Sequence, residues 1–261
     1  MNEARDGNRP SAPERQLGVI VKMPAAASVE LAGHAGFDYV MIDTEHGAGD
    51  MIELEHHVRA AETAGIRPLV RVSDARSPDI LRALDAGACG IIAPHALSEL
   101  EVRQAVSLTR YPPAGRRGLA LSTRAGAYGT RTAAEHVEAA EELLLIVQIE
   151  DAEALERLPE ILDAEGLDGI FIGPSDLSAS LGVRGQTDHP AVEAAIERVV
   201  EAVLQRPSLR LCVLASDEHE ALRWFDRGAH LVLVNISTLL STRLRDIRGA
   251  VAEASLSEAR S

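Results

Sequence analysis

Short runs of apolar, often β-branched residues recur along the chain, separated by longer stretches whose apolar residues repeat with a helical period. These runs predict eight strands, at residues 18–23, 38–43, 68–72, 90–94, 143–150, 169–173, 211–215 and 231–235. The stretches between them carry helix-start signals at Ser77, Ser98, Asp188 and Ser216, and helix-end glycines at positions 36, 65, 87, 166 and 228. Strands that alternate with helices are typical of a parallel sheet.

Eight strand-helix units without a linker predict an α/β protein, a single-domain (β/α)8 TIM barrel, over residues 17–256. A doubly wound sheet usually has fewer strands and a glycine-rich first turn, so it is disfavoured. Residues 1–16 have charges of both signs and no apolar stretch, which predicts a disordered or frayed tail and not a signal peptide. Residues 111–132, rich in Pro, Gly and Arg, predict a long loop that covers a site or forms an interface.

Composition narrows the class of partner. The 26 basic and 40 acidic residues give a net charge of −14, and only 3% of residues are aromatic, so nucleic-acid binding is disfavoured. No apolar run approaches the roughly 18 residues of a membrane span. Cys89 and Cys212 form no CxxC motif, which disfavours a disulfide framework and fits a reducing cytoplasm. We therefore expect a cytoplasmic protein that binds small molecules, with no membrane or nucleic-acid partner.

Polar residues follow four of the predicted strands at their carboxyl ends, where barrel enzymes carry their chemistry. Asp43 and Arg71 end two strands, Gln148 and Glu150 alternate on a third, and Asp176 follows the turn after a fourth. Two carboxylates on neighbouring strands, Glu150 and Asp176, suit a hard divalent cation. The alternative is that each acid only caps the helix that follows it.

The cations at the same rim point to an anionic substrate. The planar fork of Arg71 matches a carboxylate, although a salt bridge to Asp43 or Asp74 is the alternative. A metal, an arginine and the helix start at 173–175 together fit a 2-oxo acid. His46 lies close to Asp43 in sequence, as expected of an acid that orients a general base, although a lone histidine is more often structural.

The only lysine, Lys22, lies near the end of the first predicted strand. A Schiff-base aldolase needs a lysine at the barrel mouth, so this second mechanism stays open. The other interpretation of Lys22 is an ion-paired or solvated side chain facing the acidic rim.

The chain resembles the HpcH/HpaI aldolase family, the class II, metal-dependent pyruvate aldolases, over about residues 18–240. The matching stretches are GFDYVMIDTEHG, PLVRV, LDAGACGIIAP, RYPPAGRRG, VQIE and GLDGIFIGPSDLSASLG. The resemblance implies that Glu150 and Asp176 hold Mg, Mn or Co, and that Asp43, His46 and Arg71 are catalytic. It implies substrate contacts from Arg71, Gln148, Gly173, Pro174, Ser175 and Leu214, and from Asp85 across a subunit interface.

The family implies a carbon–carbon lyase, specifically an aldehyde-lyase, that reversibly cleaves a 4-hydroxy-2-oxo acid to pyruvate and an aldehyde through a metal-stabilised pyruvate enolate. It also implies a homo-oligomer, a hexamer built as a trimer of dimers, and makes the C-terminal helix a candidate for exchange between subunits. The chain departs from well-known family members on the aldehyde side, at Ile20, Lys22, the GAGD segment and the loop with Arg124 and Tyr128. The identity of the aldehyde and the roles of these residues therefore stay open.

Two other functions are weighed against the aldolase. The same enolate chemistry serves an oxaloacetate decarboxylase or a citrate-synthase-like enzyme of siderophore synthesis that condenses an acyl-CoA. A non-catalytic oligomeric barrel that senses a ligand is the third hypothesis, which the full set of metal and base residues disfavours. The preferred metal and the stereochemistry are not determined by the sequence.

Overall fold

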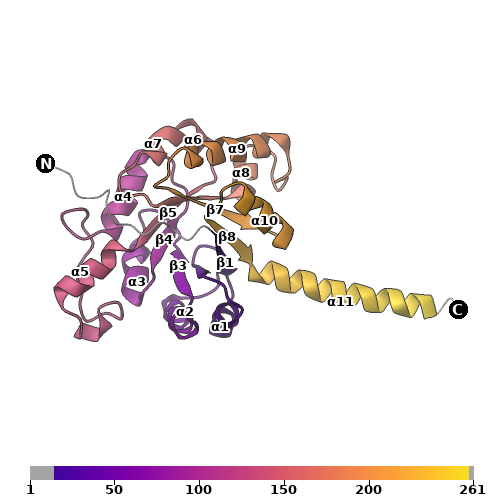
Figure 1. Ribbon diagram of the computed structural model, residues 1–261, viewed down its shortest axis with the longest axis horizontal. Helices are drawn as coiled ribbons and strands as arrows, with labels where there is room; N and C mark the ends of the chain where they lie inside the picture. Colours follow the sequence, from indigo (N-terminus) through magenta and orange to yellow (C-terminus); the bar gives the residue numbers. More distant parts are fainter. Residues whose placement is uncertain (1–14, 259–261) are drawn as a thin grey trace.

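A computed structural model describes residues 15–258, in which eight parallel strands close into a barrel in sequence order, β1 to β8 (Figure 1). The strands are β1 Gln16–Val21, β2 Tyr39–Asp43, β3 Arg67–Arg71, β4 Gly90–Ala93, β5 Leu144–Ile149, β6 Gly169–Ile172, β7 Arg210–Ala215 and β8 Leu231–Asn235. All eight predicted strands are confirmed, and so is the (β/α)8 barrel. Of the expected tail at 1–16, residues 1–14 lie outside the described residues, and β1 begins at Gln16.

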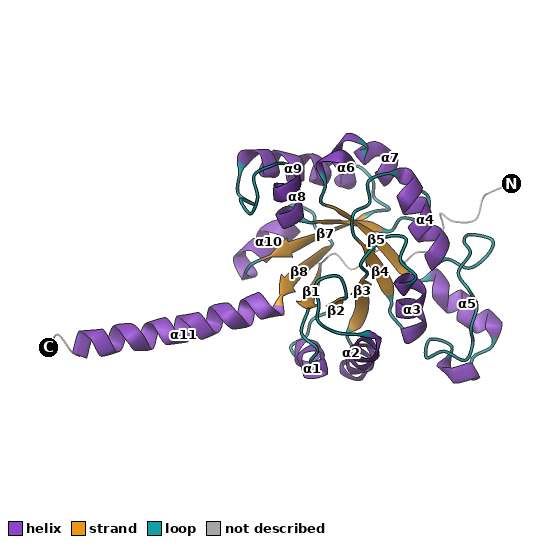
Figure 2. Ribbon diagram, turned by 180° about the vertical axis from the view of Figure 1, so that it is seen from behind, coloured by secondary structure: helices purple, strands orange, loops and turns teal. Residues whose placement is uncertain are grey.

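Helices surround the barrel, as seen from both sides in Figures 1 and 2. They are α1 Ala26–His34, α2 Met51–Ala64, α3 Asp79–Ala86, α4 Glu99–Thr109, α5 Ala133–Glu141, α6 Ala152–Glu156, α7 Leu158–Leu162, α8 Pro174–Ser180, α9 Pro190–Leu204, α10 Glu218–Asp226 and α11 Ile236–Glu258, with a short 3-10 helix, η1, at Ala127–Gly129. The five glycines predicted to end helices all have positive φ, from 70° at Gly65 to 104° at Gly87.

Three of the four predicted helix starts shift by one residue, and the N-cap of α3 is Pro78 in place of Ser77. The N-cap of α9 is His189, whose Nδ1 accepts from the Ala191 N–H at 3.2 Å, because Pro190 takes the first helical position that its fixed φ suits. The N-cap of α10 is Asp217, whose carboxylate accepts from the Glu220 N–H at 2.8 Å. Ser98 caps α4 as predicted.

The strands have two buried faces, because the helices cover the outside and side chains fill the inside. The interior is filled by alternate residues such as Met41 on β2, Leu69 on β3 and Ile146 on β5. Asp43 and Arg71 pair in register at the ends of β2 and β3, in phase with these apolar residues. Their side chains therefore point toward the barrel axis at its carboxyl-end mouth, as does Gln148.

The last helix, α11, extends away from the barrel (Figure 1). In a closed (β/α)8 barrel the eighth helix usually completes the outer ring. Here it carries a stripe of exposed apolar side chains into solvent, at Leu240, Leu244, Ile247 and Val251. No helix among the described residues is long and apolar enough to cross a membrane.

Candidate active site

Arg71 is the centre of a buried ion-pair network at the mouth. Its Nε donates to Asp43 Oδ1 at 3.0 Å and its Nη2 to Asp43 Oδ2 at 2.6 Å. Its Nη1 donates to Gln148 Oε1 at 3.3 Å and lies 3.1 Å from Glu45 Oε2. Burial alone would raise the pKa of Asp43, but the hydrogen bonds and charge of Arg71 hold it below its ordinary value. The salt bridge to Asp43, one alternative for Arg71, is therefore present, and Nη1 is directed toward the other polar residues of the mouth.

The Asp43 carboxylate does not contact the His46 imidazole. Asp43 Oδ1 accepts the backbone N–H groups of Glu45 and His46, each at 3.2 Å, while Arg71 contacts both of its oxygens. The imidazole is half exposed, with Nε2 3.9 Å from Glu45 Oε2. In this arrangement Asp43 orients Arg71 and the turn after β2.

Glu150 is a carboxylate that is almost wholly buried, with 1% of its side chain exposed. Its Oε1 accepts the backbone N–H of His95 at 2.9 Å, and its Oε2 accepts from the Gln148 side chain. Burial raises the pKa of Glu150 to about 7, and the negative charges of Asp176 and Glu45 act in the same direction. A buried carboxylate beside two other acids is costly to keep charged without a bound proton or cation. This environment therefore favours binding of a cation by Glu150.

Neither predicted metal carboxylate caps a helix. The N-cap of α6 is Asp151, one residue after Glu150, and the N-cap of α8 is Gly173, three residues before Asp176. Asp176 lies exposed in the first turn of α8, which also contains Pro174 and Ser175. The capping alternative therefore does not explain either acid.

Gly173 allows the β6 end to approach the buried acid. A Cβ built on Gly173 would lie 2.6 Å from Gln148 Nε2 and 2.9 Å from Glu150 Cβ. Because Gly173 has φ −103°, the need for glycine here comes from space and not from backbone conformation.

His95 is a residue of the mouth that our sequence reasoning missed. It lies two residues after β4, and its Nδ1 forms a hydrogen bond with Asp151 Oδ2 at 3.0 Å and lies 3.3 Å from Glu150 Oε1, while Nε2 lies 3.6 Å from Glu45 Oε1. Partial burial alone would lower the pKa of His95, but the carboxylates of Asp151, Glu150 and Glu45 raise it. The signal was available, since the strand-end argument that selected Asp43 and Arg71 applies equally to the residue after IIAP.

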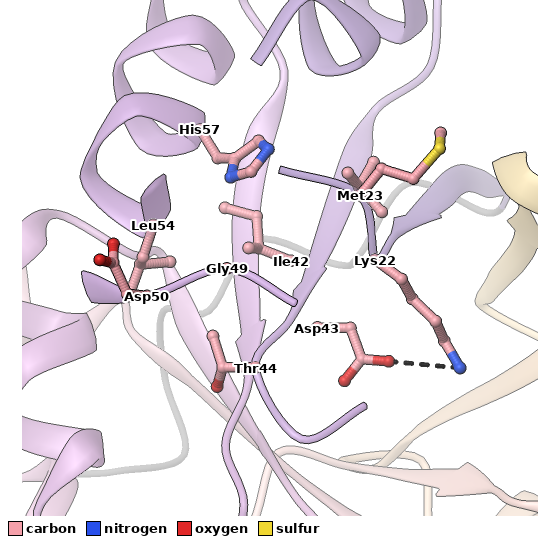
Figure 3. Close-up of a pocket in the computed structure, with 10 residues that line it drawn as sticks. Lys22, Met23, Ile42, Asp43, Thr44, Gly49, Asp50, Leu54 and His57 are labelled. Carbon is pink, nitrogen blue, oxygen red and sulfur yellow. Dashed lines mark ion pairs between the residues drawn. The ribbon is translucent and has the colours of Figure 1, made fainter. Parts of the chain in front are cut away.

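Lys22 and Leu214 border the same mouth. Lys22 Nζ lies 3.5 Å from Asp43 Oδ2, so Lys22 adopts the ion-paired alternative, and Figure 3 shows it across a small pocket from His57. Leu214 is partly buried against the apolar barrel interior. His57 is buried, with its imidazole close to the backbone of Glu53 and Met23.

Three other residues from the sequence analysis have their contacts elsewhere in this single chain. Asp85, on α3, pairs with Arg117 at 3.0 Å. Arg124 pairs with Glu62 on α2 and donates to the Ala86 carbonyl at 3.1 Å, so its guanidinium is engaged in the helix layer. Tyr128 is 64% exposed in the long loop.

The donors at the mouth fit a divalent cation. His95, Glu150 and Asp151 each offer one ligand atom, and these atoms all lie within 4.8 Å of one another. Glu45 is nine-tenths buried, and its Oε2 accepts no hydrogen bond although Arg71 lies close to it. Carboxylate oxygens are the ligands that Mg²⁺ and similar hard cations prefer.

A sequence model of the HpcH/HpaI aldolase/citrate lyase family matches residues 16–242. The chain belongs to this family. A 4-hydroxy-2-oxo-heptane-1,7-dioate aldolase of Escherichia coli is 35% identical over 235 residues, which are 90% of this chain and 89% of the relative.

The chain is also similar to a second aldolase and to a solved structure. A 2-keto-3-deoxy-L-rhamnonate aldolase of Escherichia coli strain K12 is 35% identical over 240 residues, 91% of this chain and 89% of the relative. The crystal structure of citrate synthase SbnG superposes with a TM-score of 0.82 at 31% identity, covering 92% of this chain and 94% of that chain.

Proposed function

We propose that this protein is a divalent-metal-dependent aldolase that reversibly cleaves a 4-hydroxy-2-oxo acid to pyruvate and an aldehyde. The observation that carries the proposal is the buried Glu150 carboxylate, set beside Asp176 and Arg71 at the mouth of the barrel. The two Escherichia coli relatives, each named as an aldolase of an oxo or keto acid, support the same reaction class.

Glu150 and Asp176 are the proposed ligands of Mg, Mn or Co, which when bound supplies positive charge that stabilises a developing enolate. Arg71 adds a second positive charge at that oxygen, and Asp43 keeps its guanidinium in place through two hydrogen bonds. Gln148 lies between Arg71 and Glu150, so it orients both groups toward one substrate.

The remaining proposed contacts surround the substrate. Gly173, Pro174 and Ser175 form the turn into α8. The Gly173 N–H donates to the Ile149 carbonyl at 3.1 Å and Pro174 has no N–H, so the backbone N–H groups of Ser175 and Asp176 are the donors proposed for the substrate carboxylate. Leu214 forms an apolar wall, and His46 moves the proton of the 4-hydroxyl group. Asp85 pairs with Arg117 in its own chain, so its proposed contact is with the substrate bound at the barrel mouth of a neighbouring subunit.

A second candidate function is condensation of an enolate with an acyl-CoA or decarboxylation of oxaloacetate, favoured by the structural similarity to citrate synthase SbnG. Product analysis with oxaloacetate alone tests for decarboxylation, and product analysis with oxaloacetate and acetyl-CoA tests for condensation. Citrate formation, or carbon dioxide release without any aldol cleavage, contradicts the aldolase assignment.

The test of the main proposal is exchange of the pyruvate methyl protons in deuterated water, followed by NMR. We expect exchange that requires Mg²⁺ or Mn²⁺, stops with chelator and is absent in Glu150→Gln and Asp176→Asn, both of which keep the fold. Full exchange in either variant contradicts the assigned metal site. Exchange that survives chelation but is blocked by borohydride trapping moves the chemistry to Lys22.

We also propose a homo-oligomer, specifically a hexamer arranged as a trimer of dimers, in a cytoplasmic location. The support for association is α11, whose residues Leu240, Leu244, Ile247 and Val251 recur at spacings of four, three and four. All four are at least half exposed in the single chain. Such a stripe on a projecting helix is typical of a surface that another subunit covers.

A further inference from the structure

We propose that His95 is a third protein ligand of the divalent cation, through its Nδ1, and that Glu45 orients the imidazole from the opposite side. The inference rests on the metal site proposed at Glu150 and Asp176, and it extends that site to a nitrogen donor.

The donor atoms around Glu150 are spaced like neighbouring ligands of one octahedral cation. Adjacent ligands of an octahedral cation with bonds of about 2.1 Å lie about 3 Å apart. His95 Nδ1 lies 3.3 Å from Glu150 Oε1 and forms a hydrogen bond with Asp151 Oδ2 at 3.0 Å, so ligation of a cation through Nδ1 exchanges that hydrogen bond for a metal bond. The imidazole nitrogen and the buried carboxylate oxygen are therefore already separated by the distance expected of neighbouring ligands of one ion.

The backbone fixes His95 in this place. Its φ of 52° is in the left-handed region, which few residues other than glycine, asparagine, aspartate and histidine adopt readily. Its N–H donates to Glu150 Oε1 at 2.9 Å, so the main chain and the imidazole of one residue converge on the same carboxylate. A change in the position of Glu150 would therefore move His95 with it.

Glu45 supplies the second observation. Its side chain is nine-tenths buried, its Oε2 forms an ion pair with Arg71 Nη1 at 3.1 Å, and its Oε1 lies 3.6 Å from His95 Nε2. A small rotation of the ring brings Nε2–H within hydrogen-bond distance. Histidines that bind metals usually donate their second N–H to a carboxylate, which fixes the tautomer and the ring orientation.

The consequence is a preference among metals. Two carboxylates alone suit Mg²⁺, whereas an imidazole ligand favours Mn²⁺, Co²⁺ and other transition ions over Mg²⁺. We therefore expect this protein to bind Co²⁺ much more tightly than Mg²⁺, with His95 responsible for a large part of the difference.

The experiment uses the metal-free full chain, with Mn²⁺ for spectroscopy and with Co²⁺ and Mg²⁺ for calorimetric titration. The variant is His95→Asn, because asparagine also accepts the left-handed backbone but lacks the imidazole. The control is His219→Gln, which removes the imidazole of the exposed group formed by Asp217, Glu218 and His219. Glu150→Gln reports on the proposed metal site itself.

We expect the electron spin echo of bound Mn²⁺ to show imidazole nitrogen modulation in the wild type and in His219→Gln, and none in His95→Asn. Co²⁺ affinity should fall at least about tenfold in His95→Asn, with a smaller change for Mg²⁺. Modulation absent from the wild type, or lost only in His219→Gln, overturns the inference. If the wild type binds Mn²⁺ without nitrogen modulation and Glu150→Gln does not bind Mn²⁺, the inference about His95 fails but the proposed metal site at Glu150 stands. A wild type that binds no Mn²⁺ contradicts both the inference and the proposed function.

Discussion

At the scale of single residues, the structure of the barrel mouth depends on the buried ion pair between Asp43 and Arg71. Asp43 is fully buried and Arg71 nearly so, and the two form a paired set of hydrogen bonds. Removing one member of a buried pair leaves the other without compensation, which costs about 3–5 kcal/mol. Any test of Arg71 in substrate binding must therefore separate that effect from loss of stability.

We expect Arg71→Met to lower the free energy of unfolding by about 3–5 kcal/mol and to abolish pyruvate binding. The double variant Arg71→Met with Asp43→Asn removes both charges and should recover much of the stability but none of the pyruvate affinity. Chemical denaturation and pyruvate titration measure the two effects. Pyruvate affinity that returns together with the stability of the double variant would mean that Arg71 has only a structural role.

His57 gives a second prediction at this scale, on the pH dependence of stability. Burial lowers the pKa of His57, although the nearby charge of Glu53 acts in the opposite direction. A histidine with a lowered folded-state pKa binds fewer protons in the folded than in the unfolded protein, so stability is lost as pH falls below about 6.5.

We expect His57→Leu to reduce this loss between about pH 7 and pH 5 when unfolding is followed by urea titration. His56→Gln, on the exposed face of α2, is the matched control and should keep the wild-type dependence. An identical pH dependence in wild type and His57→Leu would rule out His57 as the source.

At the scale of elements, the site is made by the ends of strands that come from distant parts of the chain. β2, β3 and β5 contribute Asp43, Arg71 and Gln148 because their side chains continue the inward phase of the barrel. The turn from β6 into α8 comes so close to β5 that only glycine fits at position 173. The spacing between these elements is therefore as important as the polar residues themselves.

We expect Gly173→Ala to weaken metal binding about tenfold or more, because its methyl group would displace Gln148 and Glu150. Overpacking at this position should also cost about 1–3 kcal/mol of stability. Gly118→Ala is the control, since no atom lies within 4 Å of the added Cβ. Metal affinity of Gly173→Ala equal to that of the control would show that the close approach is not needed.

At the scale of the whole molecule, the single chain leaves an apolar stripe of α11 exposed to water. The stripe lies on one face of a helix of 23 residues, most of which extends beyond the barrel. Burying several large aliphatic side chains contributes about 1.5–3 kcal/mol for each one. Association is the simplest way for this protein to obtain that stabilisation.

We expect Leu244→Glu with Ile247→Glu to reduce the molar mass measured by light scattering after size-exclusion chromatography. Thr242→Glu adds a charge on the opposite face of α11 and should leave the assembly unchanged. A wild type that elutes as a monomer, or an assembly that tolerates both glutamates, would contradict the proposed role of the stripe.

The eight strands, their order around the barrel and most of the residues at its mouth are predictable from the amino-acid sequence alone. The physical reason is that each of these depends on local patterning: apolar runs of strand length, glycines at helix ends, and polar residues directly after strands. The family followed from the same motifs, and the match over residues 16–242 confirms it.

The tertiary structure decided which of those residues contact one another. The sequence placed Asp43 beside His46, but a buried aspartate between a guanidinium and a histidine pairs with the permanent cation, and that choice depends on register across β2 and β3. The positions of His95 and Glu45 around Glu150 likewise depend on three strand ends meeting, separated by about 50 residues or more along the chain. The position of His95 after a strand can be recognised in the sequence, but its proximity to Glu150 and Glu45 is long-range, leaves no local pattern and appears only in the closed barrel.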